Sequence, residues 1–298
     1  MLKVNHVTKY YDDFRAVNDI SFEIKEGEIF GLLGVNGAGK TTTFRMIMGL
    51  LDKTKGTITL DGKKIDYDVS DKIGFLTEER SLLPSLTVLE QAIYYGTLKG
   101  MSKKKINEKL DYYLELFNIT EYKNKKIKEL SKGNQQKIQF ITSIIHEPRL
   151  LILDEPFSGL DPINVELFKN VILDLKKKNT IIIFSSHQMQ HVEYFCDSLI
   201  ILVKGTPVLQ GKLTKIKNDY KKKNIKVIAD IDQDKILKID GVLNIEKNKN
   251  EYTIKVDSND IVESVFKEIA KCKNVEKFEV ESPTLNEIFI SKVGENYE

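Results

Sequence analysis

The stretch GVNGAGKT, residues 34–41, constrains this chain more than any other feature. It follows the pattern of Gly, four residues and then Gly-Lys-Thr, which is typical of loops that bind nucleotide phosphates. The apolar run of residues 29–33 before it predicts a buried strand, and residues 42–50 after it predict a helix. The loop is therefore expected at a helix N-terminus, where free N–H groups and the helix dipole favour an anion. We expect a nucleoside triphosphate as the ligand.

Residue chemistry assigns roles within this loop. Its glycines allow backbone conformations with positive φ and a close approach to phosphate oxygens. The Lys40 side chain is long enough to reach the β and γ phosphates, and the Thr41 hydroxyl is placed to bind magnesium. The alternative, a chance glycine-rich turn, is disfavoured by the strand before the loop and the helix after it.

Length and composition indicate a soluble globular protein. A chain of 298 residues predicts about two domains, and its longest apolar runs are far shorter than the roughly 18 residues of a membrane span. No apolar leader opens the sequence, so we expect a cytosolic protein that reaches a membrane only through a partner. With 46 basic and 44 acidic residues the net charge is +2, which predicts no nucleic-acid partner.

Two further apolar runs end in residues with useful chemistry. Residues 150–153 predict a buried parallel strand whose carboxyl end presents Asp154 and Glu155 to the crevice where ligands of open α/β sheets bind. Asp154 is expected to support magnesium and Glu155 to polarise a water. The next strand, residues 180–184, ends near His187, which could donate to a γ-phosphate. An acidic turn and a structural histidine are the alternatives.

The remaining patterns outline the domains. Residues 2–28 predict two antiparallel strands, with Tyr11 before a turn where its ring either stacks on a base or packs on the core. A helical stretch follows Pro84 and begins with the capping box Thr87 to Glu90. Ser131 precedes another helix, as a plain N-cap or as part of a second anion site.

The last part of the chain has a different character. Residues 212–224 are polar and rich in lysine, which predicts a linker. Beyond it, short strands and two helices predict a small α+β domain over residues 225–298, with no recognisable catalytic group. The two cysteines, Cys196 and Cys272, fit neither a zinc pattern nor a disulfide framework.

Together these features resemble the nucleotide-binding subunit of ATP-binding cassette (ABC) transporters over residues 2–211. The end of the chain, SPTLNEIFI, resembles the accessory domain of bacterial subunits grouped with sodium and drug exporters. The motifs that carry the resemblance occur in the family's order: GVNGAGKT at 34–41, LSKGNQ at 130–135, LLILDEP at 150–156, SGLD at 158–161 and SSH at 185–187.

The resemblance implies an α/β fold, a P-loop NTPase cassette in residues 1–211. Such a cassette has a RecA-like core, an antiparallel β subdomain and a helical subdomain, here at about residues 86–146. The small α+β domain would follow it. Two copies would face each other head to tail and bury two ATP molecules with Mg²⁺, and Tyr11 would stack on adenine.

The resemblance also implies site residues, one by one. The phosphates would be held by Gly34, Val35, Asn36, Gly37, Ala38, Gly39, Lys40, Thr41 and Thr42. Besides Lys40, the catalytic residues would be Glu155 as general base and His187 at the γ-phosphate. The metal ligands would be Thr41, Glu78 and Asp154. The opposite copy would contribute Ser131, Lys132, Gly133 and Asn134, and Asp161 would connect the two sites.

Three residues depart from the family's pattern. Glu78 stands where the family has glutamine, and a carboxylate can bind magnesium but donates a hydrogen bond only when protonated. Lys132 replaces a glycine, and Asn134 replaces a glutamine. Ser131 and Gly133 keep the pattern, so these departures bear on the hydrolysis rate more than on the existence of the site.

The expected function is ATP hydrolysis that energises a transporter, with family analogy favouring export. The partners would be an integral membrane subunit on a separate chain, contacted through residues 79–95, and a second ATP-binding subunit, expected to be an identical chain. The protein would then lie at the cytoplasmic side of the membrane. One alternative is a soluble mechanical ATPase of translation or DNA repair, which a single phosphate loop and the lack of sustained heptads disfavour. Another is a regulatory module without turnover, which Glu155 disfavours.

Overall fold

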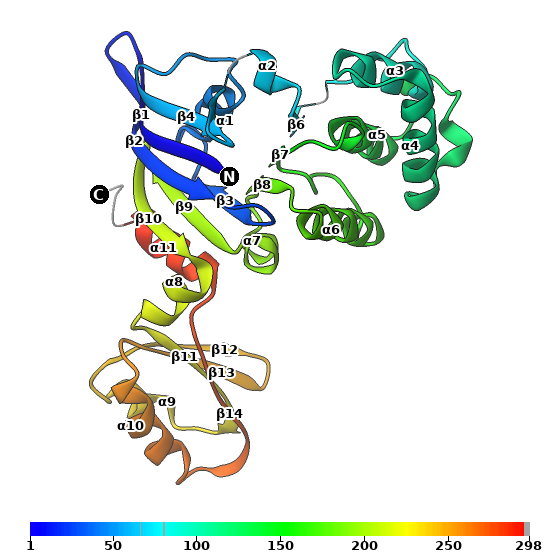
Figure 1. The fold of residues 1–298 in the computed structure, drawn as a ribbon. Coiled ribbons are helices and arrows are strands. Elements are labelled where there is room, and N and C mark those ends of the chain that lie inside the picture. Colours follow the sequence, from blue (N-terminus) through cyan, green and yellow to red (C-terminus); the bar gives the residue numbers. More distant parts are fainter. Residues whose placement is uncertain (66, 80, 295–298) are drawn as a thin grey trace. The chain divides into compact units, whose positions relative to one another are not determined.

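The structure is a computed structural model that describes residues 1–65, 67–79 and 81–294 (Figure 1). The chain forms two compact units, Met1–Gln210 and Gly211–Glu298. Among the described residues, no helix is long and apolar enough to cross a membrane.

The first unit begins with an antiparallel sheet in the strand order β2-β1-β4-β5. The predicted pair of opening strands is confirmed, and a turn at Asp12 and Asp13 sets Tyr11 opposite Phe14. Apolar side chains alternate with exposed ones along β2, so one face of the sheet is buried. The strands are β1 (Leu2–Tyr11), β2 (Phe14–Ile24), β4 (Lys55–Leu60) and β5 (Lys63–Lys64).

A six-stranded sheet, in the order β10-β9-β3-β8-β7-β6, positions the site. The pairs β3–β8, β3–β9, β6–β7 and β7–β8 are all parallel, so their carboxyl ends meet at one edge. Every residue of β3, β7 and β8 is buried, which explains their continuous apolar sequences. The strands are β3 (Ile29–Leu33), β6 (Ile73–Leu76), β7 (Leu150–Asp154), β8 (Ile181–Ser185), β9 (Ser198–Val203) and β10 (Thr206–Lys212).

Helices cover these sheets, and apolar side chains fill the space between them. Helix α1 begins at Lys40, two residues before the predicted start, and buries Phe44, Met46 and Ile47 in the core shared by both sheets. Phe22 and Phe30 stack across this core with ring centroids 4.6 Å apart. The helices of this part are α1 (Lys40–Ile47), α2 (Tyr67–Ser70), α6 (Pro162–Lys177) and α7 (Met189–Phe195).

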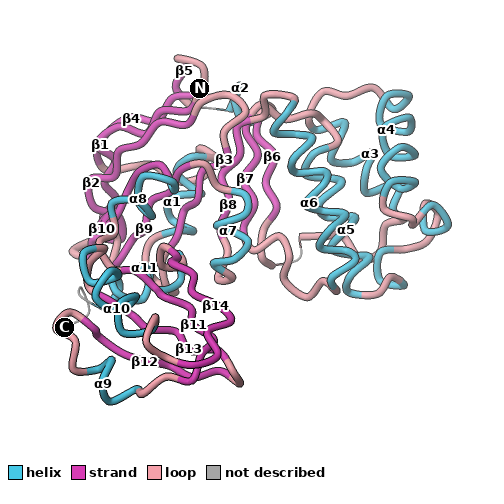
Figure 2. The backbone as a smooth tube through the Cα atoms, turned by 90° about the horizontal axis from the view of Figure 1, so that it is seen from below, coloured by secondary structure: helices cyan, strands magenta, loops and turns pink. Residues whose placement is uncertain are grey.

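Three helices lie beyond β6, the edge strand of the six-stranded sheet (Figure 2). They are α3 (Val88–Leu98), α4 (Lys103–Leu116) and α5 (Lys132–Ile144). The predicted capping box is present, because the Thr87 hydroxyl accepts from the Glu90 N–H at 3.2 Å and the Glu90 carboxylate accepts from the Thr87 N–H at 2.8 Å. Stacked rings of Phe140 and Phe168, 4.5 Å apart, join α5 to α6.

The second unit contains an antiparallel sheet in the order β12-β13-β11-β14. The core on one face of this sheet includes Ile225, Ile254 and Val265, and α10 supplies the last of these. Lysines and carboxylates occupy the alternate strand positions on the other face. The elements are β11 (Lys223–Asp230), α9 (Gln233–Leu237), β12 (Val242–Asn248), β13 (Glu251–Val256), α10 (Asp260–Ile269), β14 (Lys273–Glu281) and α11 (Leu285–Gly294).

A further helix, α8 (Leu213–Asp219), lies in the segment for which the sequence predicted a polar linker. Leu213 and Ile216 are its buried residues, and their spacing of three places both on one helix face. Because lysines occupy many of the neighbouring positions, the sequence predicts a polar linker at this place and not a helix. Helix α9 was missed as well, because five residues are too few to show a helical period.

Candidate functional site

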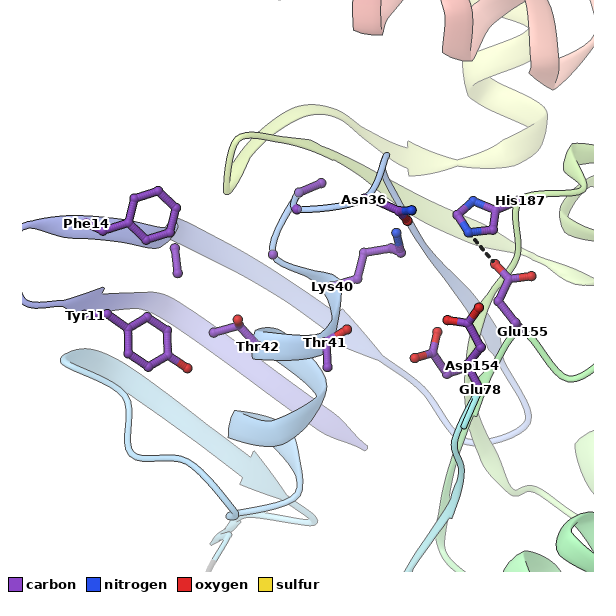
Figure 3. A pocket seen from close by; sticks show the side chains of 14 residues that line it. Tyr11, Phe14, Asn36, Lys40, Thr41, Thr42, Glu78, Asp154, Glu155 and His187 are labelled. Carbon is purple, nitrogen blue, oxygen red and sulfur yellow. Dashed lines mark ion pairs between the residues drawn. The ribbon is translucent and has the colours of Figure 1, made fainter. Parts of the chain in front are cut away.

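A cleft of about 490 Å³ lies in the first unit at the carboxyl ends of β3, β6, β7 and β8 (Figure 3). It brings together the loop before α1, the residues that follow three neighbouring strands, and the turn between β1 and β2. Its lining residues are Tyr11, Phe14, Ala16, Asn36, Gly37, Ala38, Gly39, Lys40, Thr41, Thr42, Glu78, Asp154, Glu155 and His187.

The glycine-rich loop wraps the N-terminus of α1. Gly39 has φ 97°, and a Cβ there would stand 2.7 Å from the carbonyl oxygen of Ala16, so only glycine fits. No side chain caps α1, and its first turn holds no acidic residue. The free N–H groups of this turn are therefore left to an anion in the cleft.

Lys40 stands over the loop, partly buried. Its Nζ donates to the carbonyl oxygens of Gly34 at 2.6 Å and Val35 at 3.3 Å. Burial lowers the pKa of Lys40, and the negative charges of Asp154 and Glu155 act against this effect. The sequence placed Gly34 and Val35 among the phosphate contacts, but these two residues do not line the cleft. Their carbonyl oxygens instead accept hydrogen bonds from the Lys40 ammonium.

Two carboxylates stand at the end of β7, as the sequence predicts. The Ser185 hydroxyl donates to Asp154, and the Ser186 hydroxyl donates to Glu155 Oε2 at 3.4 Å. The His187 Nε2 atom lies 3.6 Å from Glu155 Oε1 (Figure 3). Asp154 pairs with Ser185 in the β7–β8 register, so the pairing of these two strands brings the groups together.

Both carboxyl groups are nearly buried, and burial is the main cause that raises the pKa of each. The charge of Glu78 acts in the same direction on both. Glu155 also has φ 48°, in the left-handed region that a non-glycine residue seldom adopts. Within the described part of the chain, Glu155 Oε1 has no hydrogen-bond partner. A buried charged oxygen without a donor is costly unless a ligand or water satisfies it.

The residues expected to hold magnesium fit that ion. Thr41, Glu78 and Asp154 line the same cleft and offer only oxygen atoms, which Mg²⁺ prefers. In residues 1–65, 67–79 and 81–294, no group of three or more His, Cys, Asp or Glu residues is arranged to hold a metal by itself. Since Mg²⁺ commonly binds through one or two carboxylates and substrate phosphates, this donor set suits an ion that arrives with a nucleotide.

Two aromatic rings stand at the other end of the cleft from the carboxylates (Figure 3). Tyr11 is 42% exposed and Phe14 67% exposed. Large exposed rings beside a phosphate-binding loop are suited to stack on a base. Phe14 was missed at the sequence level, although the turn at Asp12 and Asp13 already places residues 11 and 14 across from each other.

The residues expected to act toward a second copy, Ser131 to Asn134 and Asp161, lie outside this cleft. Ser131 acts as the N-cap of α5, with its hydroxyl accepting from the Asn134 N–H at 3.3 Å, while Lys132 is exposed. Asp161 is the N-cap of α6 and accepts from the Asn164 N–H at 2.9 Å. The N-cap alternative for Ser131 is thus confirmed, and the role of these residues toward a second copy stays a prediction.

Comparisons with known proteins agree with this geometry. The family model of ABC transporters matches residues 17–158, and the model of the C-terminal domain of DrrA1-3-like ATP-binding proteins matches residues 211–293. The chain is 49% identical to the uncharacterized ABC transporter ATP-binding protein YhaQ of Bacillus subtilis, over 100% of both chains. It is 31% identical to the lipopolysaccharide export system ATP-binding protein LptB of Haemophilus influenzae, over 76% of this chain and 96% of LptB.

Solved structures show the same fold. The dimeric structure of MJ0796, a bacterial ABC transporter cassette, matches with a TM-score of 0.66 and 26% identity, covering 72% of this chain and 99% of that one. A dimeric post-hydrolysis state of the same cassette, bound to ADP and Pi, matches with a TM-score of 0.65 and the same identity and coverage. The expected α/β cassette is therefore confirmed.

Proposed function

Because the chain belongs to the ABC transporter family as an ATP-binding subunit, we propose that it uses this cleft to bind and hydrolyse ATP with Mg²⁺. We propose further that hydrolysis drives the opening and closing of a dimer which moves separate membrane subunits. The observation that carries the proposal is that an uncapped helix N-terminus, Lys40 and the buried Glu155 meet in one cleft, where Glu155 Oε1 has no hydrogen-bond partner among the described residues.

Each group in the cleft has a chemical task. The N–H groups of the loop and the Lys40 ammonium bind the β and γ phosphates, and the rings of Tyr11 and Phe14 hold the base. Bound through Thr41, Glu78 and Asp154, magnesium supplies positive charge that offsets the negative charge of the phosphates. Glu155 accepts a proton from the water that attacks the γ phosphorus, and the bond to the leaving ADP breaks. His187 donates to the γ-phosphate and holds Glu155.

The exposed N-terminus of α5 supports the dimer. Ser131, Lys132 and Gly133 lie at the first turn of this helix and outside the cleft of their own chain, so they are available to a γ-phosphate held by a second copy. MJ0796, a similar cassette, is described as dimeric. ATP would then bind the closed dimer better than the open one, and hydrolysis would remove that difference.

A groove in the first unit supports coupling to a membrane subunit. It has a volume of about 300 Å³ and is lined by residues of β6, α3 and α5, among them Phe75, Tyr95 and Gln139; we call it the α3–α5 groove. Leu50, at its rim, is 72% exposed. The expected contact segment, residues 79–95, borders it, although Arg80 lies outside the described residues. The name of LptB, an export system protein, supports export as the direction.

Glu155→Gln tests this proposal. The variant keeps the shape of the cleft but removes the base, so it should hold ATP and form an ATP-dependent dimer in gel filtration, while Lys40→Ala should not. ATP-loaded Glu155→Gln should then retain a multi-span membrane protein in fixed proportion from detergent-solubilised native membranes. Retention of ribosomes or soluble proteins alone would instead favour the mechanical ATPase. A wild-type rate of ATP hydrolysis by Glu155→Gln would contradict the assignment of Glu155 as the general base.

A further inference from the structure

One buried amide on α5 holds the loop that carries Glu78. Gln139 is 3% exposed. Its Nε2 donates to the Thr77 carbonyl oxygen at 3.1 Å, to the Thr77 hydroxyl at 2.9 Å and to the Glu79 carbonyl oxygen at 3.1 Å. Glu78, between these two residues, lines the nucleotide cleft beside Asp154. Gln139 therefore grips the chain on both sides of a residue of the site.

Chemistry fixes the orientation of this amide. Two of its partners are backbone carbonyl oxygens, which can only accept, so the NH₂ end of Gln139 must face residues 77–79. Its Oε1 then has no hydrogen-bond partner among the described residues. A buried acceptor left unpaired costs free energy. The Nε2 atom of Gln139 thus holds the loop while its Oε1 atom stays unpaired and buried. A residue that served only for packing would not need to carry this cost.

Among the described residues, Gln139 is also the main side-chain support of this loop from outside it. The Thr77 hydroxyl donates to the Glu79 carbonyl oxygen, a bond within the loop itself. No other side chain in the described ranges donates a hydrogen bond to residues 77–79. The position of Glu78 therefore depends on α5, the helix that also presents Ser131 to Gly133 and lines the α3–α5 groove.

We propose that Gln139 is the positioning residue for Glu78, and that through Glu78 it sets how tightly magnesium binds with the nucleotide. The proposal rests on the function proposed above and goes beyond it, because Gln139 touches neither the nucleotide cleft nor its carboxylates. It also links the α3–α5 groove to the site, since a shift of α5 moves Glu78 through one amide group.

A double-mutant cycle tests this link. Gln139→Leu, Glu78→Ala and the double variant are compared by the free Mg²⁺ concentration that half-saturates binding of a fluorescent, non-hydrolysable ATP analogue. Loss of a group that orients a metal ligand weakens metal binding by about 10-fold or more. We expect each single variant to need about 10-fold more Mg²⁺, and the double variant to need no more than Glu78→Ala. The change in the ATP analogue's affinity without Mg²⁺ should stay within about twofold, because Lys40 and the α1 N-terminus are untouched.

Lys137→Met is the matched control. Lys137 is buried on the same helix, and its Nζ donates to the Phe117 carbonyl oxygen at 3.1 Å, away from the cleft. This variant should lower the melting temperature but leave the Mg²⁺ requirement unchanged. The link would be overturned if the two single variants' increases in the Mg²⁺ requirement multiplied in the double variant. It would also be overturned if Gln139→Leu bound Mg²⁺ as the wild type does. Either result would leave the proposed function intact. A wild-type chain with no Mg²⁺-dependent nucleotide binding would overturn both.

Discussion

Carboxylates cluster in the nucleotide cleft and on the sheet of the second unit, and their pKa values are shifted in opposite directions at the two places. In the nucleotide cleft, Asp154 and Glu155 are nearly buried, burial raises the pKa of each, and Glu155 Oε1 has no hydrogen-bond partner among the described residues. On the sheet of the second unit, the Lys277 ammonium lies 2.9 Å from Glu279 and lowers the pKa of that carboxyl. The cleft carboxylates are buried and face hydroxyl groups and His187, whereas the sheet carboxylates are more exposed and face lysines.

The pairing on the sheet is systematic. Ion pairs join Lys226 to Glu281 at 2.8 Å, Lys255 to Glu246 at 2.7 Å and Lys277 to Glu251 at 2.8 Å. Exposed pairs of this kind contribute little, about 0–1 kcal/mol each, but they cost little as well. Buried carboxylates with raised pKa values are costly without a ligand, and such groups concentrate at functional sites. The difference agrees with the proposal that the first unit hydrolyses ATP and that the sheet charges serve local structure.

The largest expected effect is on turnover. Glu155→Gln should lower the ATP hydrolysis rate by about 100- to 1,000-fold, because general bases typically contribute about 10²- to 10⁴-fold. Glu279→Gln, the matched change on the sheet, should stay within about twofold of the wild-type rate. Release of phosphate, measured with saturating ATP and Mg²⁺, compares the two variants. A large loss of turnover in Glu279→Gln would break the distinction between the units.

Ligand affinity should show the next largest effect. Lys40→Ala removes charge-assisted hydrogen bonds to phosphate, which contribute about 1.5–3 kcal/mol each, so ATP affinity should fall by about 10- to 100-fold. Lys226→Ala removes a lysine whose partner is Glu281 on the sheet, and its ATP affinity should equal that of the wild type. Calorimetric titration with ATP gives both values. Equal weakening by the two variants would contradict the assignment of Lys40 to the phosphates.

The sequence predicts the residues that line the cleft better than the residues that hold them in place. Local motifs identify Lys40, Asp154, Glu155 and His187, because the glycine loop and the ends of buried strands have recognisable sequences. Gln139 could not be identified, since its role depends on hydrogen bonds to Thr77 and Glu79, about 60 positions away in the sequence.

The charged sheet face shows the same limit. Lys255 and Glu246 are nine positions apart, and only the antiparallel register of β12 and β13 brings them together. Alternation in β13 predicts which residues share a face, but it does not say which charges meet. Short elements such as α9 were missed because tertiary packing, and not a local period, stabilises them.

A smaller effect concerns stability against pH. In the ligand-free protein, the raised pKa of Glu155 means that the folded state holds its proton more tightly than the unfolded state. Stability from this group is therefore complete below the ordinary carboxyl pKa of 4.5 and is lost as pH rises through the raised value. Glu155→Gln, which has no such proton to lose, should melt at a higher temperature than the wild type at pH 8 and show no advantage near pH 4. Glu279→Gln should show no gain at pH 8. A lower melting temperature for Glu155→Gln at pH 8 would contradict the burial cost.

The smallest expected effect lies on the sheet. Lys255→Met should reduce the unfolding free energy of the protein by about 0.5 kcal/mol, because it removes partly exposed contacts with Glu246 at 2.7 Å and Glu287 at 3.4 Å while keeping the apolar stem. The loss should shrink in 1 M salt, which screens such pairs. Denaturant unfolding of Lys255→Met, Glu246→Gln and the double variant isolates the pair. A loss of about 2 kcal/mol or more, comparable to that of a core substitution, would contradict the small contribution expected of these exposed pairs.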